Sequence, residues 1–83
     1  MELSDRILQH VVDRHLVQAW NAQPETLELR AGNIHQEMRL SNRMPAVCSV
    51  VGSNRFQTLT RIRLLNRTGS QNGANATFVY KLP

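Results

Sequence analysis

The chain has 83 residues, 41% of them hydrophobic, which is enough for one globular domain (residues 1–83) but too few to support a deep substrate pocket. Its single cysteine, Cys48, excludes an intrachain disulfide and a cysteine-cluster zinc site. The formal net charge is +4. No signal sequence is recognised, and no apolar run approaches the ~18 residues that a membrane span needs. These features predict a cytoplasmic protein with no membrane contact.

The N-terminal segment predicts an amphipathic helix from about Ser4 to Trp20, followed by a short strand over Thr26–Leu29. Ser4 is the expected N-cap, and the helix should end before Asn21. Trp20 is either a lid on the core or part of a dimer contact, and the residues leave both alternatives open. The apolar residues that recur at helical spacing are Ile7, Leu8, Val11, Val12, Leu16 and Ala19.

Two helices joined by a tight turn are expected next. The first begins near Gly32, and the second spans about residues 42–52 with Ser41 or Asn42 as its N-cap. With Asn42 as the cap, Pro45 lies in the first turn, where its missing amide would have had no intrahelical partner. The buried side of this second helix is expected to consist of Met44, Val47, Val50 and Val51. Gly52 is expected to end the helix.

The C-terminal third predicts one more helical turn or two and then two strands. Ser53 can cap the turns, which should carry Phe56 and Leu59 inward. The strands should run over residues 62–67 and 76–82. Between them lies a polar loop, residues 69–75, in which the Asn72-Gly73 pair is a hairpin-turn signal.

Alternation along these strands predicts which residues share a face. Arg63, Leu65 and Arg67 should lie opposite Ile62 and Leu64 on the first strand. On the second strand the shared face should hold Phe78, Tyr80 and Leu82. The predicted core consists of Ile7, Val11, Leu16, Leu29, Ile34, Val47, Val51, Phe56, Leu64, Phe78 and Tyr80.

This order of elements resembles the winged helix-turn-helix DNA-binding superfamily. The stretch from Leu29 to Val51 and the C-terminal hairpin carry the resemblance. It implies an α+β fold with a three-helix core, a short strand after helix 1 and a C-terminal β-hairpin wing. It also implies a third helix in the major groove and a wing, residues 67–76, on the backbone or minor groove. The apolar segment around Phe56 and Leu59 departs from that pattern.

The charge is divided unevenly along the chain. Residues 1–30 contain five acidic residues and three arginines, a balance of −2, whereas residues 31–83 contain one acidic residue and seven basic ones, a balance of +6. Nine of the ten basic residues are arginines, whose planar guanidinium suits phosphate oxygens and guanine edges. Such a split predicts a polyanionic partner, and we expect it to be double-stranded DNA.

Candidate base contacts lie on the third helix, where Asn42 and Arg43 begin it and Ala46 and Ser49 follow at helical spacing. In the alternative reading, Asn42 only caps the helix and Arg43 is a solvated surface residue. Candidate phosphate and wing contacts are Arg39, Arg55, Arg67, Gln71, Asn72, Asn75 and Lys81. If five cations (Arg39, Arg43, Arg55, Arg67 and Lys81) each neutralised one phosphate, log K would fall with log salt at a slope of about −4.

Strand cations have a simpler explanation, because charges on an edge strand protect it against pairing with another chain. For Arg61 and Arg63 that explanation is preferred, whereas Arg67 is expected to contact phosphate.

A metal site and an enzymatic site are not expected. In an α-helix His10 and His15 would project about 140° apart, and His35 is expected to be an ordinary surface residue, so three convergent ligands are missing. No catalytic triad, phosphate loop or carboxylate pair is present, and no cofactor is expected. Cys48 is expected to be a buried structural thiol rather than a redox sensor.

The sequence therefore predicts a DNA-binding protein, either a small transcriptional regulator or a DNA-reading accessory module. The alternative is a winged-helix module for protein–protein contact in a larger nucleic-acid-processing complex, with the basic face against an acidic partner. RNA binding is disfavoured because the few aromatic residues are mostly assigned to the core. Whether the chain forms a homodimer or joins a partner protein is left open.

Overall fold

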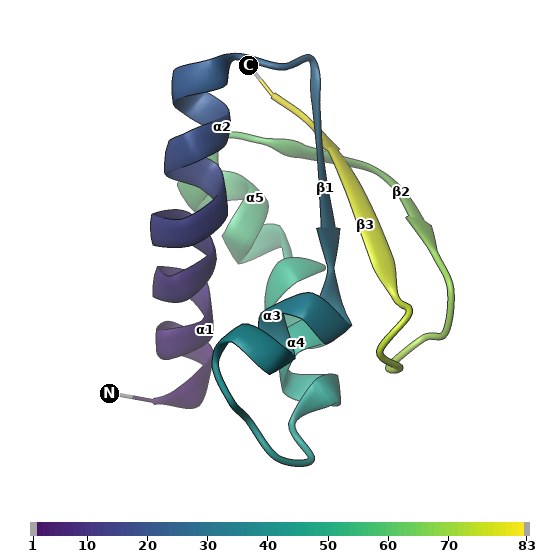
Figure 1. The fold of residues 1–83 in the computed structure, drawn as a ribbon. Helices are drawn as coiled ribbons and strands as arrows, with labels where there is room; N and C mark the ends of the chain where they lie inside the picture. The colour runs from purple at the N-terminus through teal and green to yellow at the C-terminus, as the bar shows by residue number, and fades with distance from the viewer. Residues whose placement is uncertain (1, 83) are drawn as a thin grey trace.

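The computed structural model describes residues 2–82, in which helices pack on one face of a three-stranded antiparallel sheet (Figure 1). This arrangement confirms the predicted α+β class. Within the described range no helix is long and apolar enough to cross a bilayer. The helical segments are α1 (Leu3–Val11), the π-helical turn η1 (Val12–Leu16), α2 (Val17–Ala22), α3 (Ala31–Glu37), α4 (Met44–Val51) and α5 (Asn54–Thr60), and the strands are β1 (Thr26–Arg30), β2 (Arg63–Thr68) and β3 (Thr77–Lys81).

The first three helical segments form one continuous helix, which confirms the predicted N-terminal helix and extends it at both ends. Glu2 occupies the N-cap position without a side-chain cap hydrogen bond, so the prediction that Ser4 caps the helix is wrong. The helix ends at Ala22, where Gln23 adopts a left-handed φ of 54°. The π-helical turn in its middle was not predicted. It closes i→i+5 hydrogen bonds, and so inserts one residue into the helical repeat.

The turn between α3 and α4 is built differently from its prediction. Arg43 holds the N-cap position of α4, and the prediction that Ser41 or Asn42 caps this helix is wrong. Asn42 instead shapes the turn with a left-handed φ of 54°, a conformation that asparagine tolerates better than most residues. Pro45 lies in the first turn of the helix as expected.

α5 confirms the helical turns expected after α4. Ser53 is its N-cap, because the Ser53 hydroxyl oxygen accepts a hydrogen bond from the Phe56 amide at 3.1 Å. Phe56 is buried, but Leu59 is 59% exposed, so its predicted inward position is wrong. Only the side of this short helix that carries Phe56 and Thr60, four residues apart, packs against the core.

The sheet has the order β1-β3-β2, with β3 in the centre and both pairings antiparallel. Phe78, Tyr80 and Leu82 are buried, which confirms the predicted face of the last strand. The hydroxyl of Tyr80 donates a hydrogen bond to the carbonyl of Val51 in the last turn of α4, and thereby joins the central strand to that helix.

A β-bulge interrupts β2. The register steps from Leu64 opposite Tyr80 to Asn66 opposite Val79, which leaves Leu65 without a partner on β3. Arg67 then pairs with Phe78 and lies on the same face as Leu64. The predicted shared face of Arg63, Leu65 and Arg67 is therefore wrong, because one inserted residue reverses the alternation beyond it.

The loop between β2 and β3, residues 69–76, bends at an unexpected position. Gly69 is left-handed with φ 84°, and a Cβ atom at that residue would lie 2.1 Å from the carbonyl oxygen of Asn75. Neither Asn72 nor Gly73 has a positive φ, whereas the two-residue turn favoured by an Asn-Gly pair requires it at both positions. The predicted hairpin between β2 and β3 is confirmed, but its turn is not the two-residue type that the Asn72-Gly73 pair indicates.

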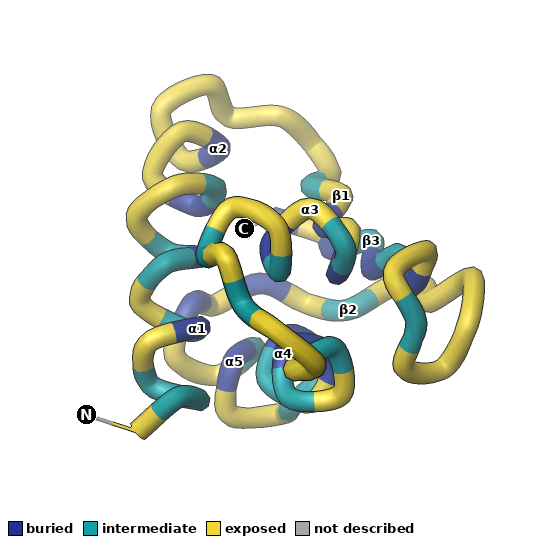
Figure 2. The backbone as a smooth tube through the Cα atoms, turned by 60° about the horizontal axis from the view of Figure 1, so that its bottom comes forward, coloured by how far each residue is buried: buried dark blue, intermediate teal, exposed yellow. Residues whose placement is uncertain are grey.

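The core lies between the sheet and the helices. Buried positions face inward along each element, while the two loops before α4 and β3 are largely exposed (Figure 2). Leu64 is half-buried, and Trp20 is 39% exposed beside Pro24 in a surface hollow, so neither belongs to the fully buried set. The other predicted core residues are confirmed at 1% exposure or less: Ile7, Val11, Leu16, Leu29, Ile34, Val47, Val51, Phe56, Phe78 and Tyr80.

Candidate nucleic-acid interface

The loop before α4 presents the first group of predicted contacts. Arg39, Asn42 and Arg43 are all exposed there, and left-handed backbone at Arg39 and Asn42 bends the chain twice before the helix begins. The backbone amide of Arg43 donates to His35 Nε2 at 3.2 Å, which corrects the expectation that His35 is an ordinary surface residue. This hydrogen bond helps fix the point from which the Arg43 side chain leaves the N-terminus of α4.

The outer surface of α4 is uncharged and made of short side chains. Pro45 and Ser49 are exposed and Ala46 is half-buried, while Val47 and Val51 face the core. This is the side on which Ala46 and Ser49 were predicted. None of the residues of α4 carries a charge, so a polyanion on this surface would find its cations at the two ends of the helix.

Arg67 supplies the cation at the C-terminal end of α4. Its guanidinium carbon lies 4.8 Å from the centroid of the Phe78 ring, and the guanidinium also donates a hydrogen bond to the carbonyl of Gln71. A side chain at Gly52, the C-cap of α4, would contact the same guanidinium. Arg43 and Arg67 therefore flank α4, whose eight residues span about 12 Å along the helix axis at a rise of 1.5 Å per residue.

Two of the predicted phosphate contacts are less available to DNA, although Arg55 lines the same groove as Ala46 and Ser49. Arg55 forms an ion pair with Asp5 at 2.9 Å, which joins α5 to the start of α1 and partly neutralises its charge. Lys81 is opposite Arg63 and Thr26 at one end of the sheet, whereas the β2–β3 loop follows the pair Thr68 and Thr77 at the other end. Figure 1 shows the C-terminus at the top of the sheet and this loop at its lower right.

The polar residues of the β2–β3 loop divide into structural and exposed ones. Asn75 is used within the loop, because its side-chain oxygen accepts a hydrogen bond from the Ser70 amide at 3.1 Å. Gln71 contributes its backbone carbonyl to Arg67, while its side chain and that of Asn72 belong to exposed residues. Of the three residues predicted here, Gln71 and Asn72 are thus the better placed for contact with a ligand.

The structure also brings together residues that were not predicted. The amides of Ala31 and Gly32 donate to the carbonyls of Ala76 and Ala74 at 2.9 and 3.0 Å, so the start of α3 holds the β2–β3 loop. Arg30, Asn33 and Gln36 line a polar groove between α3 and this loop. The polar residues are visible in the sequence, but their approach to the loop depends on pairing between β1 and β3, which no local pattern indicates.

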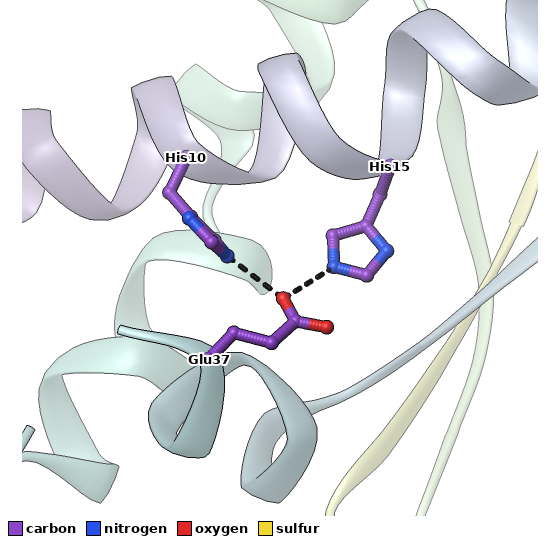
Figure 3. Close-up of side chains that lie close together, drawn as sticks. All are labelled: His10, His15 and Glu37. Atoms are coloured by element: carbon purple, nitrogen blue, oxygen red, sulfur yellow. Dashed lines mark hydrogen bonds and ion pairs between the residues drawn. The ribbon is translucent and has the colours of Figure 1, made fainter. Parts of the chain in front are cut away.

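His10, His15 and Glu37 converge between the N-terminal helix and α3. His10 Nε2 and His15 Nε2 lie 2.7 and 2.9 Å from the same oxygen, Glu37 Oε1 (Figure 3). The expected angle of about 140° between the histidines is wrong because η1 begins two residues after His10 and includes His15. In a π-helical turn, residues five apart point in similar directions.

The carboxylate of Glu37 is stabilised by the two imidazoles. Partial burial raises its pKa, but the hydrogen bonds from His10 and His15 and the nearby ring charges outweigh this effect, so the net pKa is lowered.

The thiol of Cys48 behaves as expected for a structural residue. It is 2% exposed, and burial raises its pKa despite the opposing effect of nearby Arg67.

Comparison of the chain with protein families, curated proteins and solved structures found no match.

Proposed function

We propose that this chain binds duplex DNA through the outer surface of α4 and the arginines at its two ends. The observation that carries the proposal is the position of Arg43 and Arg67, which flank an uncharged helix surface about 12 Å long. The major groove of B-DNA is wide enough to admit an α-helix, so this uncharged surface can enter the groove while an arginine at the end of the helix contacts the phosphate backbone.

The arrangement of elements supports the same proposal. A helix, a strand, two helices joined by a tight turn and a final hairpin follow one another, and β1 pairs with the last strand. This order is compatible with a winged helix-turn-helix, in which α4 is the recognition helix and the β2–β3 loop is the wing. The additional helix α5 departs from that pattern: Phe56 is buried, and Arg55 and Phe56 border the groove that Ala46 and Ser49 also line.

The chemistry of α4 favours weak discrimination between sequences. Ser49 can donate or accept a hydrogen bond at a base edge, and Ala46 suits a thymine methyl group, but neither forms the bidentate contacts that discriminate strongly. Arg43 is the side chain at the start of α4 that can bind guanine in a bidentate way. We therefore propose that phosphate contacts supply most of the affinity and Arg43 most of the preference, as in a small regulator or DNA-reading module.

Titration of a fluorescent duplex at several salt concentrations tests this proposal. Arg39, Arg43 and Arg67 are the cations at the proposed surface, since Arg55 is paired with Asp5 and Lys81 lies at the far end of the sheet. With Arg43 at a base edge, phosphate contacts by Arg39 and Arg67 give a slope of log K against log salt of about −2. Absence of binding at low salt would contradict DNA binding.

Arginine variants locate the surface. Arg67→Ala should weaken binding to every duplex and reduce the slope by about one, whereas Arg43→Ala should cost about 1–3 kcal/mol mainly on a preferred site selected from random duplexes. Arg63→Ala is the matched control, because it removes the same charge beside Lys81, away from the surface. An equal loss in Arg63→Ala and Arg67→Ala would show that net charge, not the proposed surface, determines binding.

A second candidate function is contact with a protein partner. One observation favours it: the α4 surface continues into a largely apolar groove of about 390 Å³ beside α1, lined by Leu8, Ala46, Val50 and Phe56. An acidic partner that inserts an apolar side chain there would use both the groove and the nearby arginines. This candidate predicts that the wild-type protein does not bind DNA. It also predicts that Ala46→Glu abolishes binding of the protein partner.

A further inference from the structure

We propose that His10, His15 and Glu37 form a binding site for a divalent transition-metal ion, with Zn²⁺ as the ion of best fit. One potential ligand atom from each of the three side chains lies within 4.8 Å of the other two. Two imidazole nitrogens and one carboxylate oxygen are common zinc ligands, and a fourth position taken by water completes a tetrahedron. Mg²⁺ and Ca²⁺ fit poorly because they prefer oxygen ligands.

The spacing of these atoms needs only a small adjustment to accept the ion. Zinc–ligand distances of about 2.1 Å in a tetrahedron place neighbouring ligand atoms about 3.4 Å apart. The two nitrogen–oxygen distances are now 2.7 and 2.9 Å, as expected for hydrogen bonds, so each would lengthen by about half an ångström. The two imidazole nitrogens lie within 4.8 Å of each other and would approach by up to about 1.4 Å. The three side chains are 18%, 25% and 32% exposed, which leaves room for that movement and for a water ligand.

The backbone supports this site at a position where an ordinary helix would not. η1 begins two residues after His10 and includes His15, and it turns both imidazoles toward α3. π-Helical turns are rare insertions that occur frequently at functional sites. Glu37 is the last residue of α3, so an ion bound here would connect the N-terminal helix to the helix that precedes the α4 loop.

Calorimetric titration of untagged, chelator-treated protein with ZnCl₂ tests the inference. We expect one ion per chain, and the substitutions His10→Gln, His15→Gln and Glu37→Gln should each weaken binding by about tenfold or more, since even loss of an outer-shell partner costs 10–100-fold. His35→Gln is the matched control. It removes the remaining histidine but keeps an acceptor for the Arg43 amide, and it should leave Zn²⁺ affinity unchanged.

Two further measurements separate a metal site from a purely structural hydrogen-bonded cluster. Zn²⁺ at about 100 times its Kd should raise the Tm of the wild-type protein by about 10 °C or more and leave that of His10→Gln nearly unchanged. Bound Co²⁺ should show the intense visible absorption of a tetrahedral site. Circular dichroism confirms that each variant is folded. Absence of stoichiometric Zn²⁺ binding, or equal weakening in His35→Gln and Glu37→Gln, would overturn the inference.

Discussion

Replacement of Tyr80 by phenylalanine should destabilise the fold without changing its shape. The Tyr80 ring is buried and packs edge-on against Phe56, with centroids 5.6 Å apart, and a phenylalanine ring can keep this contact. The hydroxyl group is different, because it donates a buried hydrogen bond to the Val51 carbonyl at the end of α4. Its removal leaves that carbonyl without this donor and should cost about 2 kcal/mol, or about 10 °C in Tm.

The same substitution should change the response of the protein to alkaline pH. Burial raises the pKa of Tyr80 well above its usual value of about 10, although nearby Arg67 partly opposes the shift. The unfolded chain therefore releases this proton first, so stability is unaffected below about pH 10 and falls as the pH rises toward the folded-state pKa. Between pH 9 and pH 11 the loss should be about 1.4 kcal/mol, and it should be absent in Tyr80→Phe.

Urea unfolding at pH 9 and pH 11 measures both effects. Both proteins should carry Cys48→Ala, because the Cys48 thiol also has a raised pKa and would contribute to the alkaline response. Tyr80 is the single tyrosine of the chain, so tyrosinate absorbance reports its ionisation directly. A loss below about 0.5 kcal/mol in Tyr80→Phe, or the same pH dependence in both proteins, would refute this role of the hydroxyl group.

Three further comparisons test the fold, two by urea unfolding of paired variants and one by the reactivity of a thiol. Ser53→Ala should cost about 1 kcal/mol as the loss of an N-cap, whereas Ser4→Ala should cost much less, and equal losses would contradict the assigned caps. Gly69→Ala should cost at least about 2 kcal/mol of stability, because Gly69 has a φ of 84° and a Cβ atom there would meet the Asn75 carbonyl. Gly73→Ala should cost less, and the opposite ranking would place the left-handed turn at Gly73. Cys48 should react with a thiol reagent far more slowly in the native protein than in urea, and similar rates would mean that it is not buried.

Local patterns were sufficient to predict much of the fold. Apolar periodicity located the N-terminal helix and the buried strand face with Phe78 and Tyr80, because both depend on side chains that are close in sequence. Insertions in the regular repeat could not be predicted from these patterns. The bulge at Leu65 moved Arg67 to the face of Phe78, and the N-cap of α4 shifted because His35 binds the Arg43 amide across the turn.

The candidate sites were predictable to different degrees. Arg43 and Arg67 could be predicted as DNA contacts because both belong to the basic part of the chain, residues 31–83, but the position of Arg67 beside the C-terminal end of α4 depends on the bulge and was not predicted. The pairing of Arg55 with Asp5 joins residues 50 positions apart, and so it could not be predicted from local charge. The convergence of His10 and His15 was excluded by ideal α-helical geometry, and a single π-helical turn reverses that conclusion.

The location of bound DNA tests the proposed function most directly. An amide correlation spectrum of isotope-labelled protein, recorded while a short duplex is added at low salt, reports which residues contact it. The proposed surface predicts shifts concentrated at Arg39, Arg43, Ser49, Arg67 and Asn72, with little change near Trp20 and Lys81. Shifts concentrated around Trp20 and Lys81 instead, or no shifts at all, would contradict the proposal that α4 and its flanking arginines bind DNA.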